Sequence, residues 1–157
     1  MNTAFTPVLV AATVASGLQA GTYYTWATGV MPGLARVDDR TFVHAMQQMN
    51  VAIVNPVFMA TFVGAPVLAA VAAASAPTSS RPWVVAGLAC AAATVAITAV
   101  ANVPLNNALD AAGDIGRIAD VAGVREAFET GWVRWNVARA ITSTASLTAL
   151  AWAALRS

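Results

Sequence analysis

The amino-acid sequence predicts an all-α integral membrane protein, a transmembrane four-helix bundle in which residues 1–157 form a single domain. Composition is the first reason: 59% of the 157 residues are hydrophobic and 10% are charged, whereas soluble domains carry about a quarter charged residues. The second reason is that the apolar residues form four long runs, which we place at residues 5–30, 46–74, 82–103 and 131–155. At about 1.5 Å per residue, each helical run is long enough to cross a hydrocarbon core about 30 Å thick.

The hydropathy and the net charge of the chain indicate which kinds of partner to expect. The mean hydropathy is +0.68 and the net charge is +1, without the large basic patch that nucleic-acid binding requires. We therefore expect the lipid bilayer and a lipophilic small molecule as partners, and no nucleic acid. The single cysteine, Cys90, lies inside an apolar run, where a small buried residue fits best. The first apolar run lacks the basic n-region of a secretory signal and is expected to be retained as a span.

Prolines divide the chain between and within these runs. Met31–Leu34, which reads Met-Pro-Gly-Leu, is expected to end the first helix, and Asp38 or Asp39 is expected to cap the next one. The second run contains Asn55–Pro56 and Pro66, where the missing proline N–H permits a kink.

The segment between the third and fourth runs, residues 104–130, is the longest stretch outside the predicted spans. Apolar residues recur in it at helical spacing, which predicts an amphipathic helix at the membrane surface. The recurring positions are Ile115, Ile118, Ala119 and Ala122.

Four crossings bring the end of the first span, the start of the second, the end of the third and the start of the fourth to one side of the membrane. The polar and aromatic residues that border the spans are concentrated in these four places. We therefore expect them to form one site at this end of the bundle: Tyr23, Tyr24, Trp26, His44, Gln47, Asn50, Asn55, Asn102, Asn106, Asn107, Trp132, Trp135, Asn136 and Arg139.

The fourth span carries a polar stripe. Its members lie at i, i+3, i+4 and i+7 on one helical face: Trp132, Trp135, Asn136 and Arg139. An arginine about two turns inside a span costs roughly 2.5 to 3.5 kcal/mol if it faces lipid, so Arg139 should face the bundle. Asn102 and Asn106, one turn apart, are its expected partners. A plainer interpretation stays open, in which these polar groups only cap broken helices and hold the bundle together.

His44 is the only histidine. No cysteine or carboxylate cluster accompanies it, so we predict no metal site, because imidazole-based metal centres gather several such ligands. Two interpretations of His44 remain: a hydrogen-bonded histidine at the membrane interface, or a general base.

The distribution of arginines predicts the orientation. Cytoplasmic ends of membrane proteins are enriched in Lys and Arg, and the site end has more arginines than the opposite end. The site end carries Arg36, Arg40, Arg117, Arg125 and Arg134, against Arg81 and Arg156 at the other end. We therefore expect an integral protein of a bacterial inner membrane, with the site end in the cytoplasm.

Several segments together carry a family resemblance: residues 30–34, 38–43, 45–50 with Asn55–Pro56, 102–106 and 132–139. In order and spacing they resemble a family of small four-span membrane proteins that includes the anthrone oxygenases of polyketide pathways. The resemblance covers most of the chain. It implies oxidation of an anthrone to an anthraquinone, with molecular oxygen as co-substrate and without a bound metal or flavin.

The chemistry that the resemblance implies is compatible with the predicted site residues, to which we assign candidate roles. An anthrone must lose a proton from an acidic carbon before the carbanion meets oxygen, and His44 is the candidate base because histidine ordinarily titrates near neutral pH. Asn102, Asn106 and Arg139 would stabilise the enolate oxygen. The aromatic side chains would stack on the rings, and further amides would close the pocket. This substrate-binding set is Tyr24, Gln47, Asn50, Asn55, Asn106, Trp132, Trp135 and Asn136.

Two functions from different classes fit these observations. The first is a cofactor-independent oxygenase that acts on an anthrone-like polycyclic phenol or a similar lipophile. The second is a non-catalytic membrane module that binds a quinone or a lipid, or an accessory membrane subunit. The small residues of the predicted helices permit a homo-oligomer without requiring one.

Overall fold

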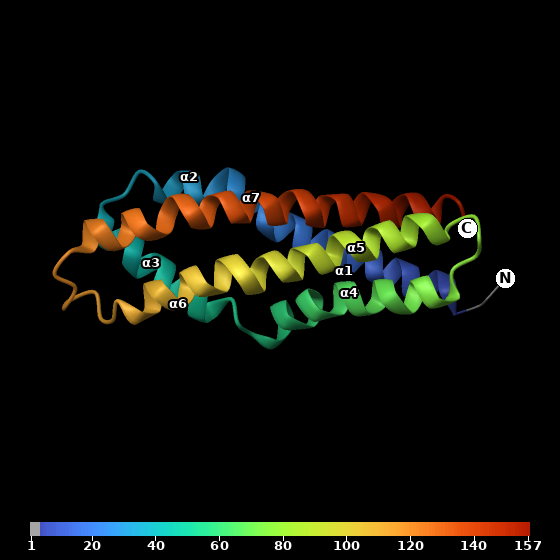
Figure 1. The fold of residues 1–157 in the computed structure, drawn as a ribbon, viewed down its shortest axis with the longest axis horizontal. Coiled ribbons are helices and arrows are strands. Elements are labelled where there is room, and N and C mark those ends of the chain that lie inside the picture. The colour runs from blue at the N-terminus through green and yellow to red at the C-terminus, as the bar shows by residue number, and fades with distance from the viewer. Residues whose placement is uncertain (1–3) are drawn as a thin grey trace.

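The structure is a bundle of helices that lie side by side along one long axis (Figure 1). It is a computed structural model that describes residues 4–157, and within these residues it contains helices and no strand. In chain order the elements are α1 (Phe5–Thr25), the π-helical turn η1 (Trp26–Val30), α2 (Met31–Leu34), α3 (Asp39–Ala52), α4 (Pro56–Ser75), α5 (Arg81–Ile97), the π-helical turn η2 (Thr98–Asn102), α6 (Val103–Ala111) and α7 (Val121–Ala154). The all-α prediction is confirmed.

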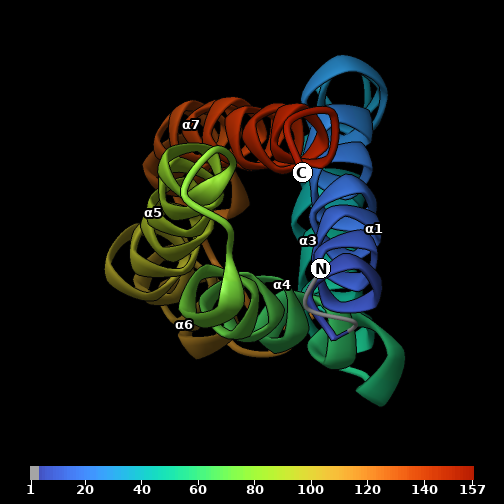
Figure 2. The same ribbon diagram turned by 90° about the vertical axis from the view of Figure 1, so that its right-hand side faces the viewer.

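Four helices form the walls of the bundle. Figure 2, which looks along the long axis, shows α1, α4, α5 and α7 around a square, and each of them packs against the two beside it. The start of α1, the α4–α5 connection and the end of α7 lie at one end, which we call the terminal end. The opposite end, which we call the head end, contains α2, α3, α6 and the start of α7.

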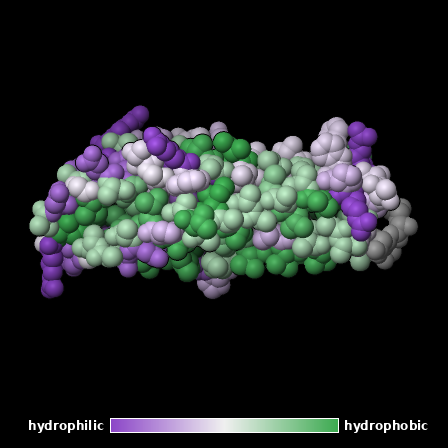
Figure 3. All heavy atoms as spheres, in the orientation of Figure 1, coloured by the Kyte–Doolittle hydropathy of each residue, from purple (hydrophilic) through white to green (hydrophobic). Residues whose placement is uncertain are grey.

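Two helical stretches are long and apolar enough, by length and composition alone, to cross a membrane. They are Pro56–Ser75 and the continuous stretch Arg81–Ala111, so two of the four predicted spans are supported and the other two stay a prediction. The remaining walls, α1 and α7, carry buried polar residues that lower their hydropathy, among them Gln19 and Arg139. On the face in Figure 3, hydrophobic residues cover the middle of the bundle, and most hydrophilic residues lie toward its two ends.

The first helix ends at Leu34, within the expected segment, but Pro32 does not break it, because the helix continues through η1 and α2. Proline has no N–H, and its ring clashes with the carbonyl four residues earlier in an α-helix. Here a π turn precedes Pro32, and the Met31 N–H bonds to the Trp26 carbonyl five residues back. The wider turn accommodates the proline without ending the helix. A second π turn, η2, precedes Pro104 in the same way.

The second predicted span, residues 46–74, is interrupted: α3 ends at Ala52 and α4 begins at Pro56. Asn55 causes the restart, because its Oδ1 accepts from the backbone N–H groups of Val57 at 3.1 Å and Phe58 at 3.0 Å. Pro66 lies inside an α4 that continues past it.

The cap of α3 is the predicted one. Asp38 accepts hydrogen bonds from the Thr41 N–H at 3.0 Å and from the Thr41 hydroxyl at 2.6 Å. These hydrogen bonds lower the pKa of the Asp38 carboxyl below its ordinary value.

The predicted amphipathic surface helix is also wrong. Residues 112–120 form a connection without helix, because Gly113 ends α6 with a φ of 81° and the Asp120 Oδ1 caps α7 by accepting from the Gly123 N–H at 2.9 Å. Ile115 and Ile118 instead pack against the apolar cluster at the head end. The fourth span is therefore part of a longer helix, since the 34 residues of α7 extend about 50 Å at about 1.5 Å per residue.

The interior has apolar clusters at both ends and polar side chains between them. The terminal cluster consists of Phe5, Leu9, Ala12, Ala69, Ala72, Val84, Leu150 and Ala153. The head cluster consists of Met31, Phe42, Val43, Met46, Leu109, Phe128 and Trp132. Between them, Gln19 donates to the Thr61 hydroxyl at 2.7 Å, and the Thr94 and Thr142 hydroxyls lie 2.7 Å apart. This polar layer positions the candidate site next to the head cluster.

Gly87 brings α5 and α7 into close contact. A Cβ at this position would lie 2.7 Å from Leu150 Cγ, and the Gly87 carbonyl accepts from the Ser146 hydroxyl at 2.8 Å. We expect Gly87→Ala to destabilise the protein by about 1–3 kcal/mol, because the core must shift to admit the methyl group. The melting temperature of the purified protein in detergent measures this loss. Gly64→Ala is the matched control, since its nearest neighbour would be Leu68 Cδ1 at 4.0 Å, and equal melting of the two variants would contradict the close contact.

Candidate functional site

Arg139 lies inside the bundle on α7, with 7% of its surface exposed. Its Nη2 donates to Asn136 Oδ1 at 3.0 Å. Its guanidinium carbon lies 4.6 Å from the centre of the Tyr23 ring and 5.3 Å from the centre of the Trp132 ring. The cation therefore lies within cation–π distance of two aromatic rings, which replace part of its lost hydration.

The asparagines of the site tie α1, α5–α6 and α7 together. Asn136 Nδ2 donates to the Tyr23 carbonyl at 3.1 Å. Asn102 Nδ2 donates to the Trp132 carbonyl at 3.4 Å, and the Trp132 indole N–H donates to Asn106 Oδ1 at 2.8 Å. The expected pairing of Asn102 and Asn106 with Arg139 is thus not the observed one, because both amides bond to Trp132.

A cavity of about 280 Å³, which we call the inner chamber, opens beside Arg139. Its walls are mostly aromatic and aliphatic, with a few polar groups. The lining residues are Thr22, Tyr23, Trp26, Asn50, Ile53, Val54, Phe58, Met59, Phe62, Thr98, Val103, Asn106, Trp132, Asn136 and Arg139. A largely apolar cavity with a few placed polar groups is the usual form of a small-molecule site.

A second cavity of about 240 Å³, the outer chamber, adjoins the first toward α3 and α6. Amides, valines and one carboxylate line it: Gln47, Asn50, Val51, Val54, Val103, Asn106, Asn107 and Asp110. Four of these residues, Asn50, Val54, Val103 and Asn106, also line the inner chamber. The two chambers therefore share a wall and together extend from Arg139 to the exposed residues of α6.

Three buried hydrogen-bond donors of the inner chamber lack an acceptor among residues 4–157. They are Tyr23 Oη, Asn50 Nδ2 and Arg139 Nε. The Thr98 hydroxyl, which donates to the Thr94 carbonyl at 2.9 Å, lies near Tyr23 Oη, but no hydrogen bond of ordinary length and angle joins Tyr23 Oη to it. Buried donors are almost always paired, so these three groups are suited to a ligand that offers an oxygen acceptor.

Several predicted site residues lie outside the chambers. His44 and Trp135 are exposed and line neither chamber. Tyr24, also exposed, lines an apolar groove on the outer surface instead. Asn55 serves as the cap of α4 described above.

Gln47 borders the outer chamber, but its amide group has a structural task. Gln47 Nε2 donates to the carbonyls of Leu109 and Gly113, each at 3.0 Å. These bonds satisfy free carbonyls at the end of α6 and hold that helix against α3.

Tyr23 lines the inner chamber, although the sequence indicates only that it lies at this end of the bundle and assigns it no role. Ser16, Gln19 and Tyr23 are all buried and lie at i, i+3 and i+7 on α1. This stripe on α1 is the signal that could have separated Tyr23 from its neighbour Tyr24. Phe58, Phe62 and Thr98 carry no comparable signal.

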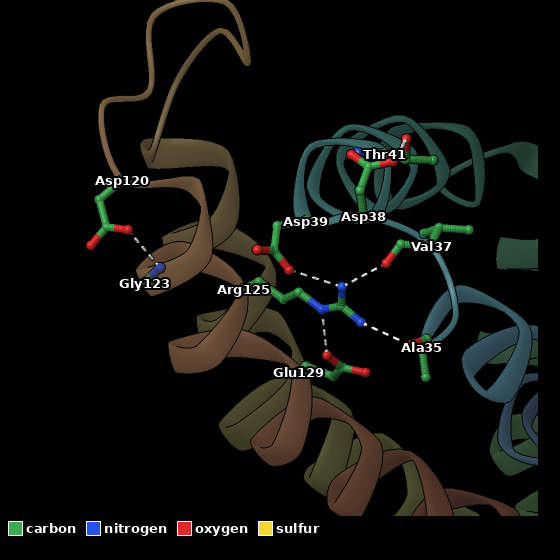
Figure 4. A network of polar contacts seen from close by, with 9 residues as sticks. All are labelled: Ala35, Val37, Asp38, Asp39, Thr41, Asp120, Gly123, Arg125 and Glu129. Carbon is green, nitrogen blue, oxygen red and sulfur yellow. Dashed lines mark hydrogen bonds and ion pairs between the residues drawn. The ribbon is translucent and has the colours of Figure 1, made fainter.

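Arg125 organises the head end, as Figure 4 shows. Its Nη1 donates to the Asp39 carboxylate at 3.0 Å and to the Val37 carbonyl at 2.9 Å, and its Nε donates to the Glu129 carboxylate at 2.7 Å. Its guanidinium carbon lies 4.4 Å from the centre of the Phe42 ring. The hydrogen bond to Glu129 is the main cause of a raised pKa of Arg125, so the side chain stays charged.

No three His, Cys, Asp or Glu side chains come close enough together within residues 4–157 to hold a metal ion. The ionisable residues of the inner chamber are Tyr23 and Arg139. The donor set of the inner chamber is therefore suited to an oxygen atom of an organic ligand.

Comparison with known proteins adds the family. The family model described as Anthrone oxygenase matches residues 45–149. The chain belongs to the anthrone oxygenase family. The match covers Asn50, Asn106, Trp132 and Arg139, whereas His44 precedes it. Neither a search of curated proteins nor a search of solved structures finds a match.

Proposed function

We propose that this member of the anthrone oxygenase family is a membrane-embedded oxygenase that oxidises an anthrone-like polycyclic ketone with molecular oxygen. The observation that carries the proposal is the group of three unpaired donors, Tyr23 Oη, Asn50 Nδ2 and Arg139 Nε, in an otherwise apolar chamber. Such donors stabilise an oxygen on which negative charge develops.

The proposed setting is a bilayer crossed four times, by α1 with α2, by α4, by α5 with α6 and by α7. The arrangement of α1, α4, α5 and α7 around a square supports it, as does the inward position of Gln19 and Arg139. Polar side chains in spans normally face the bundle interior or a wet cavity. The arginine distribution favours a cytoplasmic head end in a bacterial inner membrane.

The walls of the inner chamber fit a flat aromatic substrate. The rings of Phe58 and Phe62 stack with centres 5.8 Å apart, and the ring centres of Trp26 and Trp132 lie 5.1 Å apart. Aromatic side chains supply large contact areas and favour stacked or tilted partners. A planar ring system can therefore lie between these pairs with its oxo group toward Arg139.

The proposed reaction begins with loss of a proton from the acidic ring carbon. The electron pair of that C–H bond spreads onto the oxo oxygen, where Arg139 and Tyr23 would donate hydrogen bonds. The carbanion then reduces oxygen and forms a carbon–oxygen bond, and protonation gives a hydroperoxide that loses water to leave a second carbonyl group. One oxygen atom enters the product and the other leaves as water. The substrate carbanion supplies the electrons, so the scheme needs no metal or flavin.

Isotope labelling tests the proposal directly. Purified protein in lipid nanodiscs should consume oxygen with anthrone faster than empty nanodiscs do, which corrects for spontaneous oxidation. With labelled oxygen gas, one labelled atom should appear in the new carbonyl of the anthraquinone. Oxygen uptake equal to that of empty nanodiscs across a panel of anthrones would overturn the proposal.

A second function has its own support, because the same three donors also fit a carbonyl oxygen of a bound quinone. The protein would then be a quinone-binding module without turnover. Native mass spectrometry after gentle purification separates the two: a retained quinone at one copy per chain, together with no oxygen uptake, favours the binding module.

A further inference from the structure

We infer that Asp110 accepts the proton that leaves the substrate carbon, an inference that rests on the proposed function. Deprotonation requires a base, and the inner chamber contains only Tyr23 and Arg139 as ionisable groups. The outer chamber contributes one more, the carboxylate of Asp110. Asp110 is therefore the only carboxylate among residues 4–157 that lines either chamber.

The position of Asp110 suits a proton acceptor. It lies four residues beyond Asn106, which borders both chambers, and four helical residues extend about 6 Å along the helix axis. Asp110 is exposed, and its carboxylate takes part in no ion pair among residues 4–157. It can accept a proton from inside, directly or through one water, and release it to solvent.

The orientation of the substrate points the acidic carbon toward this end. In an anthrone that carbon lies across the central ring from the carbonyl carbon. Arg139 and Tyr23 line only the inner chamber and not the outer one, whereas Asn50 and Asn106 line both chambers. An oxo oxygen bound by Arg139 and Tyr23 therefore places the opposite ring carbon on the side of the outer chamber. The C–H electron pair stays in the ring system, and the proton passes to Asp110 and then to water.

Several of the other ionisable groups on the elements around α6 are engaged in hydrogen bonds or ion pairs, and Glu126 and Arg134 on α7 are exposed and line neither chamber. Arg40 on α3 donates to the Ile115 carbonyl at 2.8 Å, and Asp114 accepts from the Gly116 N–H at 2.7 Å. Arg125 on α7 is paired with Glu129. His44, three residues before Gln47 on the same face of α3, also lines neither chamber and is the competing base.

Deuterium exchange without oxygen isolates the proton step. Anthrone is incubated anaerobically in deuterated buffer with the protein in nanodiscs, and exchange at the acidic carbon is followed by mass spectrometry. We expect wild-type protein to accelerate exchange, and Asp110→Asn to lower that acceleration about 100-fold, within the range typical of a general base. Anthrone affinity, measured by quenching of tryptophan fluorescence, should change less than about threefold, since Asp110 binds no other part of the substrate.

Glu126→Gln is the matched control, because it removes one exposed negative charge from α7 outside both chambers. It should exchange at the wild-type rate. Asp110→Ala with added formate should regain part of the lost exchange, which a merely structural role of Asp110 would not produce.

The outcomes separate this inference from the proposed function. The inference is overturned if Asp110→Asn exchanges deuterium as fast as the wild-type protein, or if His44→Gln abolishes the exchange instead. In either case oxygen uptake by the wild-type protein would still support the oxygenase. No acceleration by the wild-type protein overturns the inference as well. Exchange that depends on Asp110, without oxygen uptake, sustains the inference and overturns the oxygenase.

Discussion

Arg139→Gln is expected to lower kcat/KM for anthrone oxidation by about 100- to 1,000-fold, the usual effect of removing one donor from a site that stabilises a developing oxyanion. Glutamine keeps an amide near Asn136 but loses the positive charge that interacts with the Tyr23 and Trp132 rings. The charge interacts with the enolate more strongly than with the neutral ketone, so kcat should fall more than KM rises. Steady-state oxygen uptake at several anthrone concentrations measures both constants.

Arg134→Gln is the matched control for this variant. It makes the same chemical change on the same helix, but Arg134 is exposed and lines neither chamber. It should retain wild-type kcat/KM. The kcat/KM of Arg139→Lys should lie between those of the two glutamine variants, because lysine keeps the charge but loses the planar group that contacts both rings. Equal activity of the Arg139 and Arg134 variants would show that the guanidinium has no part in the reaction.

The place of Arg139 could be predicted from the sequence because a single physical cost decides it. A guanidinium inside a span is too expensive to face lipid, whatever the details of the fold. The same kind of reasoning could not predict which of the adjacent residues Tyr23 and Tyr24 faces the interior of the bundle. Crossing topology brings both to the head end, but successive residues of a helix point about 100° apart, and Tyr23 is 2% exposed whereas Tyr24 is 62% exposed. Only the polar stripe on α1 distinguishes them.

Some predicted helix boundaries are wrong because local backbone interactions decide where each helix ends. Residues 115–122 have helical periodicity, but Gly113 and the Asp120 cap determine where α6 ends and α7 begins. At Pro32, by contrast, the sequence predicts a helix end but the helix continues, because a π turn accommodates the proline. Periodicity reports which face is buried, whereas backbone hydrogen bonds decide whether a helix continues. His44 illustrates the same limit for function, because its chemistry predicts a base, whereas its position outside both chambers depends on the fold.

Arg125→Ala is expected to lower the free energy of unfolding by about 2–4 kcal/mol. The Asp39 side chain is 46% exposed, so its ion pair with Arg125 contributes little. Most of the loss comes from Glu129 and from the carbonyls of Val37 and Ala35, which lose the donors shown in Figure 4. The contact of the guanidinium with the Phe42 ring is lost as well.

Thermal melting of the purified protein in one detergent measures this effect, with Arg117→Ala as the control. Arg117 is exposed on the α6–α7 connection and makes no ion pair among residues 4–157, so its removal should leave the melting temperature nearly unchanged. Arg125 joins α7 to the α2–α3 connection and to the start of α3, and α3 also supplies Asn50 to both chambers. Arg125→Ala should therefore weaken anthrone binding at temperatures well below its own melting point, because the wall of the chambers loosens before the bundle unfolds. Unchanged melting and unchanged affinity would show that Asn50 is held in place by the helix contacts of α3 alone.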